Sequence, residues 1–95
     1  MKVSRWSKKM HSLANAINTE LRSDDNRFRM TVDIRHKDGS MLLLSHAFLM
    51  EHETTEKIAI FVFTEHMGFF IFDEQDIDSY CQYSNIVKIQ AIEPN

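Results

Sequence analysis

The chain has 95 residues and a net charge of −3, and 43% of its residues are hydrophobic. This length suits one domain, so we expect residues 1–95 to form a single compact domain. The only cysteine, Cys81, cannot form an internal disulfide, which excludes a disulfide scaffold and favours a reducing, cytoplasmic setting. No apolar run reaches the length of about 18 residues that a membrane-spanning helix needs, so no membrane partner is expected.

An amphipathic helix is the first element that the sequence predicts. Apolar residues near the N-terminus recur three or four positions apart, which places them on one stripe of a helix. We expect Ser4 to cap the start of this helix and the polar cluster at 23–26 to end it. The stripe consists of Trp6, Met10, Leu13, Ile17 and Leu21.

Strands are expected to follow the helix in an antiparallel meander. Residues 27–37 alternate between apolar and polar side chains, as a half-buried strand does, and Asp38-Gly39 supplies a tight turn. The order α-β-β-β-β-α-β, with the helix packed on a mostly antiparallel sheet of about five strands, is an α+β fold. The later elements are strands at 41–50, 57–64 and 69–72, a short helix at 74–82 capped by Asp73, and a last strand at 85–92.

The middle strands carry apolar residues on both faces, which is typical of strands that are buried on both sides. One long helix covers only one face, and monomers rarely expose large apolar patches. The other face therefore needs a cover: a second copy of the chain, a different protein or a ligand. The alternative is that curvature of the sheet and the short second helix cover it. We expect the apolar partner contact to involve Leu42, Leu44, Phe48 and Met50.

The exposed face of the strand at 41–50 depends on the register of the first hairpin. A slip of one residue exchanges the two faces of a strand. In that case Met41, Leu43 and Leu49 would make the partner contact instead. Replacing Phe48 with glutamate is expected to abolish association and leave the fold intact, unless Phe48 belongs to the core.

Charge is unevenly distributed along the chain. Residues 1–39 carry nine basic and five acidic groups, whereas residues 40–95 carry two basic and nine acidic groups. In a meander, the polar segment at 51–56 and the end of the fourth strand lie at the same end of the sheet. An acidic rim at that end would orient a basic partner. Within this rim we expect Glu51, Glu53 and Asp76 to contact a partner.

A nucleic-acid-binding surface is the alternative to a protein partner. Basic residues occupy the polar face of the first strand and the start of the helix, and phosphate contacts need such clusters. Aromatic residues for stacking on bases lie on other strands, which makes this alternative weaker. The residues concerned are Arg5, Lys8, Lys9, Arg27, Arg29, Arg35 and Lys37.

No motif for catalysis, cofactor binding or metal binding is recognisable. The five histidines include no pair at a metal-ligand spacing, and no glycine-rich loop is present to hold a phosphate. Cys81 lies in an acidic segment and is expected to be buried rather than reactive. We therefore expect a non-enzymatic protein-interaction protein, such as a small intracellular inhibitor, antitoxin, immunity or accessory protein, acting as a homodimer or on another protein.

Overall fold

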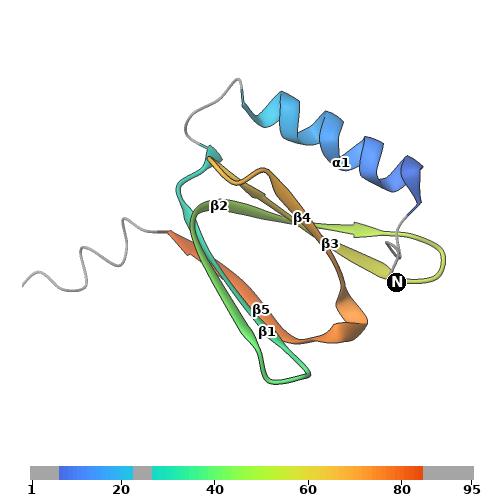
Figure 1. The fold of residues 1–95 in the computed structure, drawn as a ribbon, viewed down its shortest axis with the longest axis vertical. Helices are drawn as coiled ribbons and strands as arrows, with labels where there is room; N and C mark the ends of the chain where they lie inside the picture. The colour runs from blue at the N-terminus through green and yellow to red at the C-terminus, as the bar shows by residue number, and fades with distance from the viewer. Residues whose placement is uncertain (1–6, 23–26, 85–95) are drawn as a thin grey trace, which may run out of the picture.

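In the part of the chain that the structure describes, one helix and a five-stranded antiparallel sheet make up the fold, as the sequence predicts (Figure 1). The computed structural model describes residues 7–22 and 27–84. The strand order in the sheet is β4-β3-β2-β1-β5. The elements are α1 (Lys8–Leu21), β1 (Met30–His36), β2 (Met41–Glu53), β3 (Ile58–Thr64), β4 (Phe69–Asp73), the 3-10 turn η2 (Glu74–Asp76) and β5 (Ile77–Ser84).

Helix α1 begins one turn later than the sequence suggests. Its N-cap is Ser7, whose hydroxyl accepts a hydrogen bond from the Met10 backbone N–H at 3.2 Å, so the prediction of Ser4 is wrong. Leu13, at 36% exposure, lies at the margin of the apolar stripe. Trp6 is outside the described residues. The helix side chains that pack against the sheet are Met10, Ala14, Ile17 and Leu21.

Arg22 fastens the C-terminal end of α1 to the turn between β3 and β4. Its guanidinium donates hydrogen bonds to the backbone carbonyls of Thr64, at 2.7 Å, and of Glu65. The same group lies over the ring of Phe28, 5.1 Å from its centroid, as a cation–π contact. These contacts fix α1 over β3 and β4, and the guanidinium also donates a hydrogen bond to the Asn18 side chain in the last turn of the helix, at 3.3 Å.

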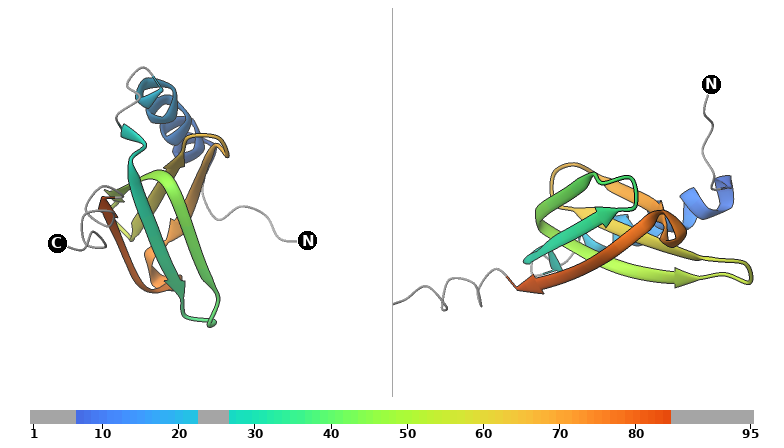
Figure 2. Two further views of the ribbon diagram at one scale, coloured as in Figure 1. Left: turned by 90° about the vertical axis from the view of Figure 1, so that its left-hand side faces the viewer. Right: turned by 90° about the horizontal axis from the view of Figure 1, so that it is seen from below.

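A β-bulge in β2 bends the sheet back on itself. Met30 of β1 pairs with Ala47, whereas Val32 pairs with Leu44, so β2 holds one extra residue between these two pairs. His46 lies in this bulge with a left-handed backbone, at φ 53°. A bulge shifts the alternation of side chains by one residue and increases the local twist. The first half of β2 therefore pairs with β1 and the second half with β3, and the strand turns sharply between them (Figures 1 and 2).

Two separate cores result from this bend, one on each face of the sheet. The inner core lies between the two halves of the bent sheet, and the helix core lies between α1 and the strands β2 to β4. Curvature of the sheet, together with β5, thus covers the face that α1 leaves open. The inner core contains Val32, Ile34, Leu44, Ala47, Ile60, Val62 and Ile77, and the helix core contains Ala14, Leu21, Phe28, Ala59, Phe61 and Phe63.

The segment at 74–82 is a strand rather than the second helix that we expected. Asp73 does cap a turn, because its carboxylate accepts a hydrogen bond from the Gln75 backbone N–H at 3.0 Å. The turn ends at Asp76, however, and the following residues pair along the whole of β1. Cys81 is consequently exposed on β5, so its predicted burial is wrong. The strand expected at 85–92 lies outside the described residues.

Candidate protein-interaction site

The four apolar residues expected to contact a partner do not share one exposed face. Leu44 is buried in the inner core and Leu42 packs against that core, because both precede the bulge. Phe48 and Met50 follow the bulge and pack in the helix core, on the opposite face of the sheet. This expectation is corrected by the extra residue at His46, which reverses the alternation within β2.

Two neighbouring exposed apolar side chains lie on the other side of the first half of β2. Met41 and Leu43 are 62% and 60% exposed. They are two of the three residues that the alternative register would bring to the surface. The third, Leu49, follows the bulge and packs against the inner core.

Strands β1 and β5 continue this exposed surface, which we call the outer face. In the antiparallel register Asp33 of β1 lies between Leu43 and Cys81, and Arg35 lies between Met41 and Ser79. Directly paired residues project on the same side of a sheet. Two rows of side chains therefore cross three strands: Leu43, Asp33 and Cys81 in one row, and Met41, Arg35 and Ser79 in the next.

Acidic side chains gather at the opposite end of β2, at what we call the acidic end: Glu51, Glu53, Glu56 and Glu74. The β2–β3 hairpin and η2 lie side by side there and border an open hollow of about 330 Å³. This agrees with the expectation that the 51–56 segment and the end of β4 share one end of the sheet. Asp73 is paired with Lys57, at 3.3 Å between Oδ2 and Nζ. The hollow is lined by Glu53, Thr54, Thr55, Glu56, Lys57, Ile58, Glu74 and Gln75.

Tyr80 joins β5 to the acidic end. Its hydroxyl donates a hydrogen bond to the Glu51 carboxylate. This hydrogen bond, followed by burial and by the negative charges of Glu51 and Glu74, raises the pKa of Tyr80 to about 12. At neutral pH the phenol keeps its proton, and the negative charge stays on the two carboxylates beside it.

Gln82, two residues further along β5, closes part of the open edge of β2. Pairing between β1 and β2 ends at Ala47, so within the described chain the residues of β2 after Ala47 pair only with β3. The Gln82 side-chain amide accepts a hydrogen bond from the Leu49 N–H at 3.1 Å and donates one to the Leu49 carbonyl at 3.3 Å. An amide side chain thus takes the place of a neighbouring strand. Sequence periodicity gave no signal for Tyr80 or Gln82 in these roles.

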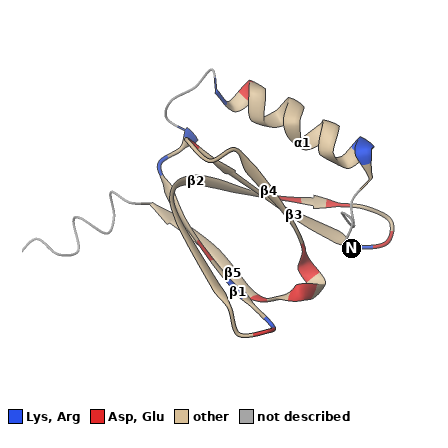
Figure 3. Ribbon diagram, in the orientation of Figure 1, with Lys and Arg blue, Asp and Glu red and all other residues tan. Residues whose placement is uncertain are grey.

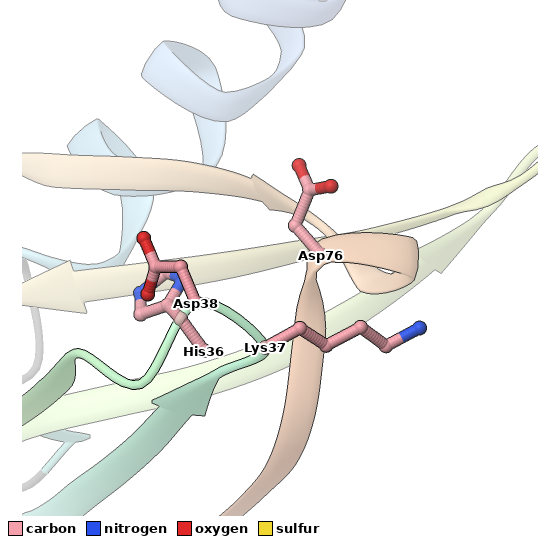
Figure 4. Close-up of a pocket in the computed structure, with 4 residues that line it drawn as sticks. All are labelled: His36, Lys37, Asp38 and Asp76. Carbon is pink, nitrogen blue, oxygen red and sulfur yellow. The ribbon is translucent and has the colours of Figure 1, made fainter.

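Asp76, the third acidic residue expected to contact a partner, is not among the residues that line the hollow at the acidic end. It lines a second hollow, of about 360 Å³, with His36, Lys37 and Asp38 at the tip of the β1–β2 hairpin (Figure 4). The Lys37 backbone N–H donates to the Asp76 carbonyl at 3.0 Å, while the Lys37 side chain points away from both carboxylates. Hydrogen bonds from Ser40 lower the pKa of Asp38.

Neither hollow offers a metal site among the residues that the structure describes. Within 7–22 and 27–84, no group of three or more histidine, cysteine, aspartate or glutamate side chains could hold a metal ion. His36 instead contacts the ring of Phe72 edge-on, with the centroids 5.4 Å apart.

The basic residues of the nucleic-acid alternative are spread over the molecule (Figure 3). Lys8 and Lys9 begin α1, whose 14 residues span about 21 Å. Arg27 and Arg29 lie beyond the other end of that helix, before β1. Two further residues, Arg35 and Lys37, belong to the far end of β1, and Arg5 lies outside the described residues. The structure therefore separates these charges into three groups.

Comparisons with protein-family models, curated protein sequences and solved structures found no match. No helix in the described part of the chain has the length and apolar character needed to cross a membrane.

Proposed function

We propose that this protein is a non-enzymatic protein-interaction domain, and that its acidic end receives a basic segment of a partner protein. The observation that supports the proposal is the convergence of Glu53 and Glu74 on one hollow from two separate segments of the chain. Glu56 also lines the hollow, and Glu51, whose carboxylate accepts a hydrogen bond from Tyr80, adds a fourth carboxylate at the acidic end. A cytoplasmic inhibitor, immunity or accessory protein that neutralises a basic target is the setting that we propose.

The chemistry of the hollow suits a guanidinium or ammonium group. Its volume, about 330 Å³, accommodates one or two long side chains rather than a folded segment. Arginine presents a planar fork that matches a carboxylate, so arginine is the preferred occupant. Lys57 does not cancel this preference, because its charge is paired with Asp73.

Electrostatic attraction at this site is expected to set the rate and orientation of binding more than its strength. Exposed ion pairs contribute about 0.2–1 kcal/mol each, and they are screened by salt. Two or three such pairs together strengthen a complex by roughly tenfold, and their loss weakens it by the same factor. The association rate, and with it the affinity, should therefore fall as salt is added.

The test is binding of a fluorescent nine-arginine peptide, followed by anisotropy at several salt concentrations. The variant Glu53→Gln/Glu74→Gln removes two charges from the acidic end and should weaken binding about tenfold. The matched control Glu20→Gln/Glu65→Gln removes two charges near the other end of the molecule and should leave binding within about twofold. Equal losses in both variants would show that the peptide responds only to net charge, and would overturn the proposed site.

A further inference from the structure

We propose that the outer face packs against the outer face of a second copy of this chain, forming a two-fold symmetric dimer. This surface is distinct from the acidic end, so the inference goes beyond the proposed function. In the dimer the two-fold axis lies between the faces and runs across the strands.

The layers of the molecule leave the outer face without a cover among the described residues. Helix α1 packs on the second half of β2 and on β3 and β4. The inner core fills the space between those strands and the layer formed by β1, β5 and the first half of β2. The other side of that second layer carries Met41 and Leu43, both about 60% exposed. Figure 2 shows β1 and β5 on the side of the sheet remote from α1.

The charges of the outer face identify its partner. Asp33 and Arg35 project on the same side of β1, one row apart, and their charges sum to zero. Their own ion pair is long, at 3.5 Å. The Arg35 side chain is 55% exposed and the Asp33 side chain is 19% exposed, so the guanidinium is open to a second carboxylate and the Asp33 carboxylate is open over a smaller area. A face that carries one charge of each sign beside apolar side chains is complementary to itself.

Symmetry decides how two such faces meet. With the two-fold axis across the strands, the two rows exchange places, so Arg35 of one copy faces Asp33 of the other and Met41 faces Leu43. With the axis along the strands, Arg35 would face Arg35 and Asp33 would face Asp33, and like charges would repel each other. Only the first arrangement pairs both opposite charges and apolar side chains.

The size of the outer face predicts a weak dimer. Three strands spaced about 4.8 Å apart and about seven residues long, at about 3.3 Å per residue, give a surface of roughly 14 by 23 Å. This area of about 320 Å² is well below the roughly 800 Å² per partner that stable complexes bury. A dissociation constant on the order of 10–100 µM is therefore expected. Sedimentation velocity from about 5 to 500 µM covers this range.

The first test compares two substitutions of exposed apolar residues by glutamate. Leu43→Glu places a carboxylate in the apolar part of the outer face, where Leu43 would meet Met41 of the second copy, and should leave the chain monomeric at every concentration. Met67→Glu, at a residue 59% exposed in the β3–β4 turn, adds the same charge away from the face and should dimerise as the wild type does. Circular dichroism verifies that both variants are folded. A wild-type chain that stays monomeric, or a dimer that Leu43→Glu leaves intact, would overturn the proposal.

A charge exchange tests the symmetry itself. Asp33→Arg alone places two positive charges on each face and should abolish dimerisation. The double variant Asp33→Arg/Arg35→Asp exchanges the two charges within one face, so the opposite charges still meet across the axis and dimerisation should return. A partner other than a second copy would not be recovered by this exchange, and a double variant that stays monomeric would refute the arrangement.

Cys81 provides an independent measurement, because it is the only cysteine of the chain and is exposed on this face. Facing sheets pack about 10 Å apart, so the two copies of Cys81 lie within roughly 12 Å of each other. A short bismaleimide should cross-link the wild type and Met67→Glu, but not Leu43→Glu. Equal cross-linking of all three proteins would count against the outer face as the interface.

Discussion

Raising the pH from 10 to 12 tests the contact between Tyr80 and Glu51. The second tyrosine, Tyr83, is first replaced by phenylalanine, so that one phenol remains. We expect this phenol to ionise with a pKa of about 12, compared with 10.0 for a free tyrosine, because it donates a hydrogen bond to Glu51. In Glu51→Gln the charged acceptor is lost, and the pKa should move back towards that of a free tyrosine.

The same shift makes the stability of the fold depend on pH. Because the folded chain binds the phenolic proton more tightly than the unfolded chain, the contact stabilises the fold below pH 10 and its contribution disappears between pH 10 and 12. A difference of two pKa units corresponds to at most about 2.7 kcal/mol. The contact lies at the surface, where solvent screens it, so about 1 kcal/mol is the expected loss in the free energy of unfolding.

Two measurements establish the result. Absorbance of the phenolate follows ionisation of Tyr80, and circular dichroism verifies that the chain is still folded at each pH. Urea unfolding at neutral pH and near pH 11 then gives the change in stability, which should be smaller in Glu51→Gln than in its parent. Ionisation of a folded chain at the pKa of a free tyrosine would refute the reasoning.

Four further substitutions test the fold. Phe48→Glu places a carboxylate in the helix core and should cost at least about 3 kcal/mol in urea unfolding, out of a total of roughly 5–14 kcal/mol for a chain of this length; a stable variant would show that Phe48 is not core. Arg22→Ala should lower the free energy of unfolding by about 1 kcal/mol and speed hydrogen exchange in α1, and unchanged exchange would contradict the anchoring role. His46→Val should cost about 1–2 kcal/mol and His46→Gly much less, because only glycine readily adopts the left-handed backbone of the bulge; equal thermal stability of the two would argue against that backbone. Gln82→Ala should cost about 1–2 kcal/mol, since both backbone groups of Leu49 lose their partner, and a neutral effect in urea unfolding would show that water replaces the amide.

Part of the candidate site could be read from the sequence. The acidic segment at 51–56 and the residues after β4 meet because a meander returns alternate turns to the same end, and the hollow does contain Glu53 and Glu74. The sequence pointed to the outer face only through the alternative register of the first hairpin, in which Met41 and Leu43 are exposed. Tyr80 and Gln82 could not be found, because their contacts join β5 to a strand that is distant in the sequence.

Local signals in the sequence determined the elements of the first two thirds of the chain. The helical stripe that ends at Leu21 and the alternation around Val32 depend on contacts between near neighbours. The tight turn depends on Gly39, which adopts φ 96°. These signals are enough to predict the helix, the four-stranded meander and the α+β class, because each signal depends on residues that are close together in the sequence.

Tertiary structure alone decided the remainder. Ile77–Ser84 is a strand because β1 offers it a free edge, and that pairing outweighs the helix-start signal at Asp73. The faces of β2 are fixed by the bulge at His46. Both sides of that strand are apolar, so either register would bury hydrophobic residues, and the sequence could not choose between them. The choice depends on how the two halves of the sheet pack, since only one arrangement fills the inner core and the helix core together and leaves Met41 and Leu43 at the surface.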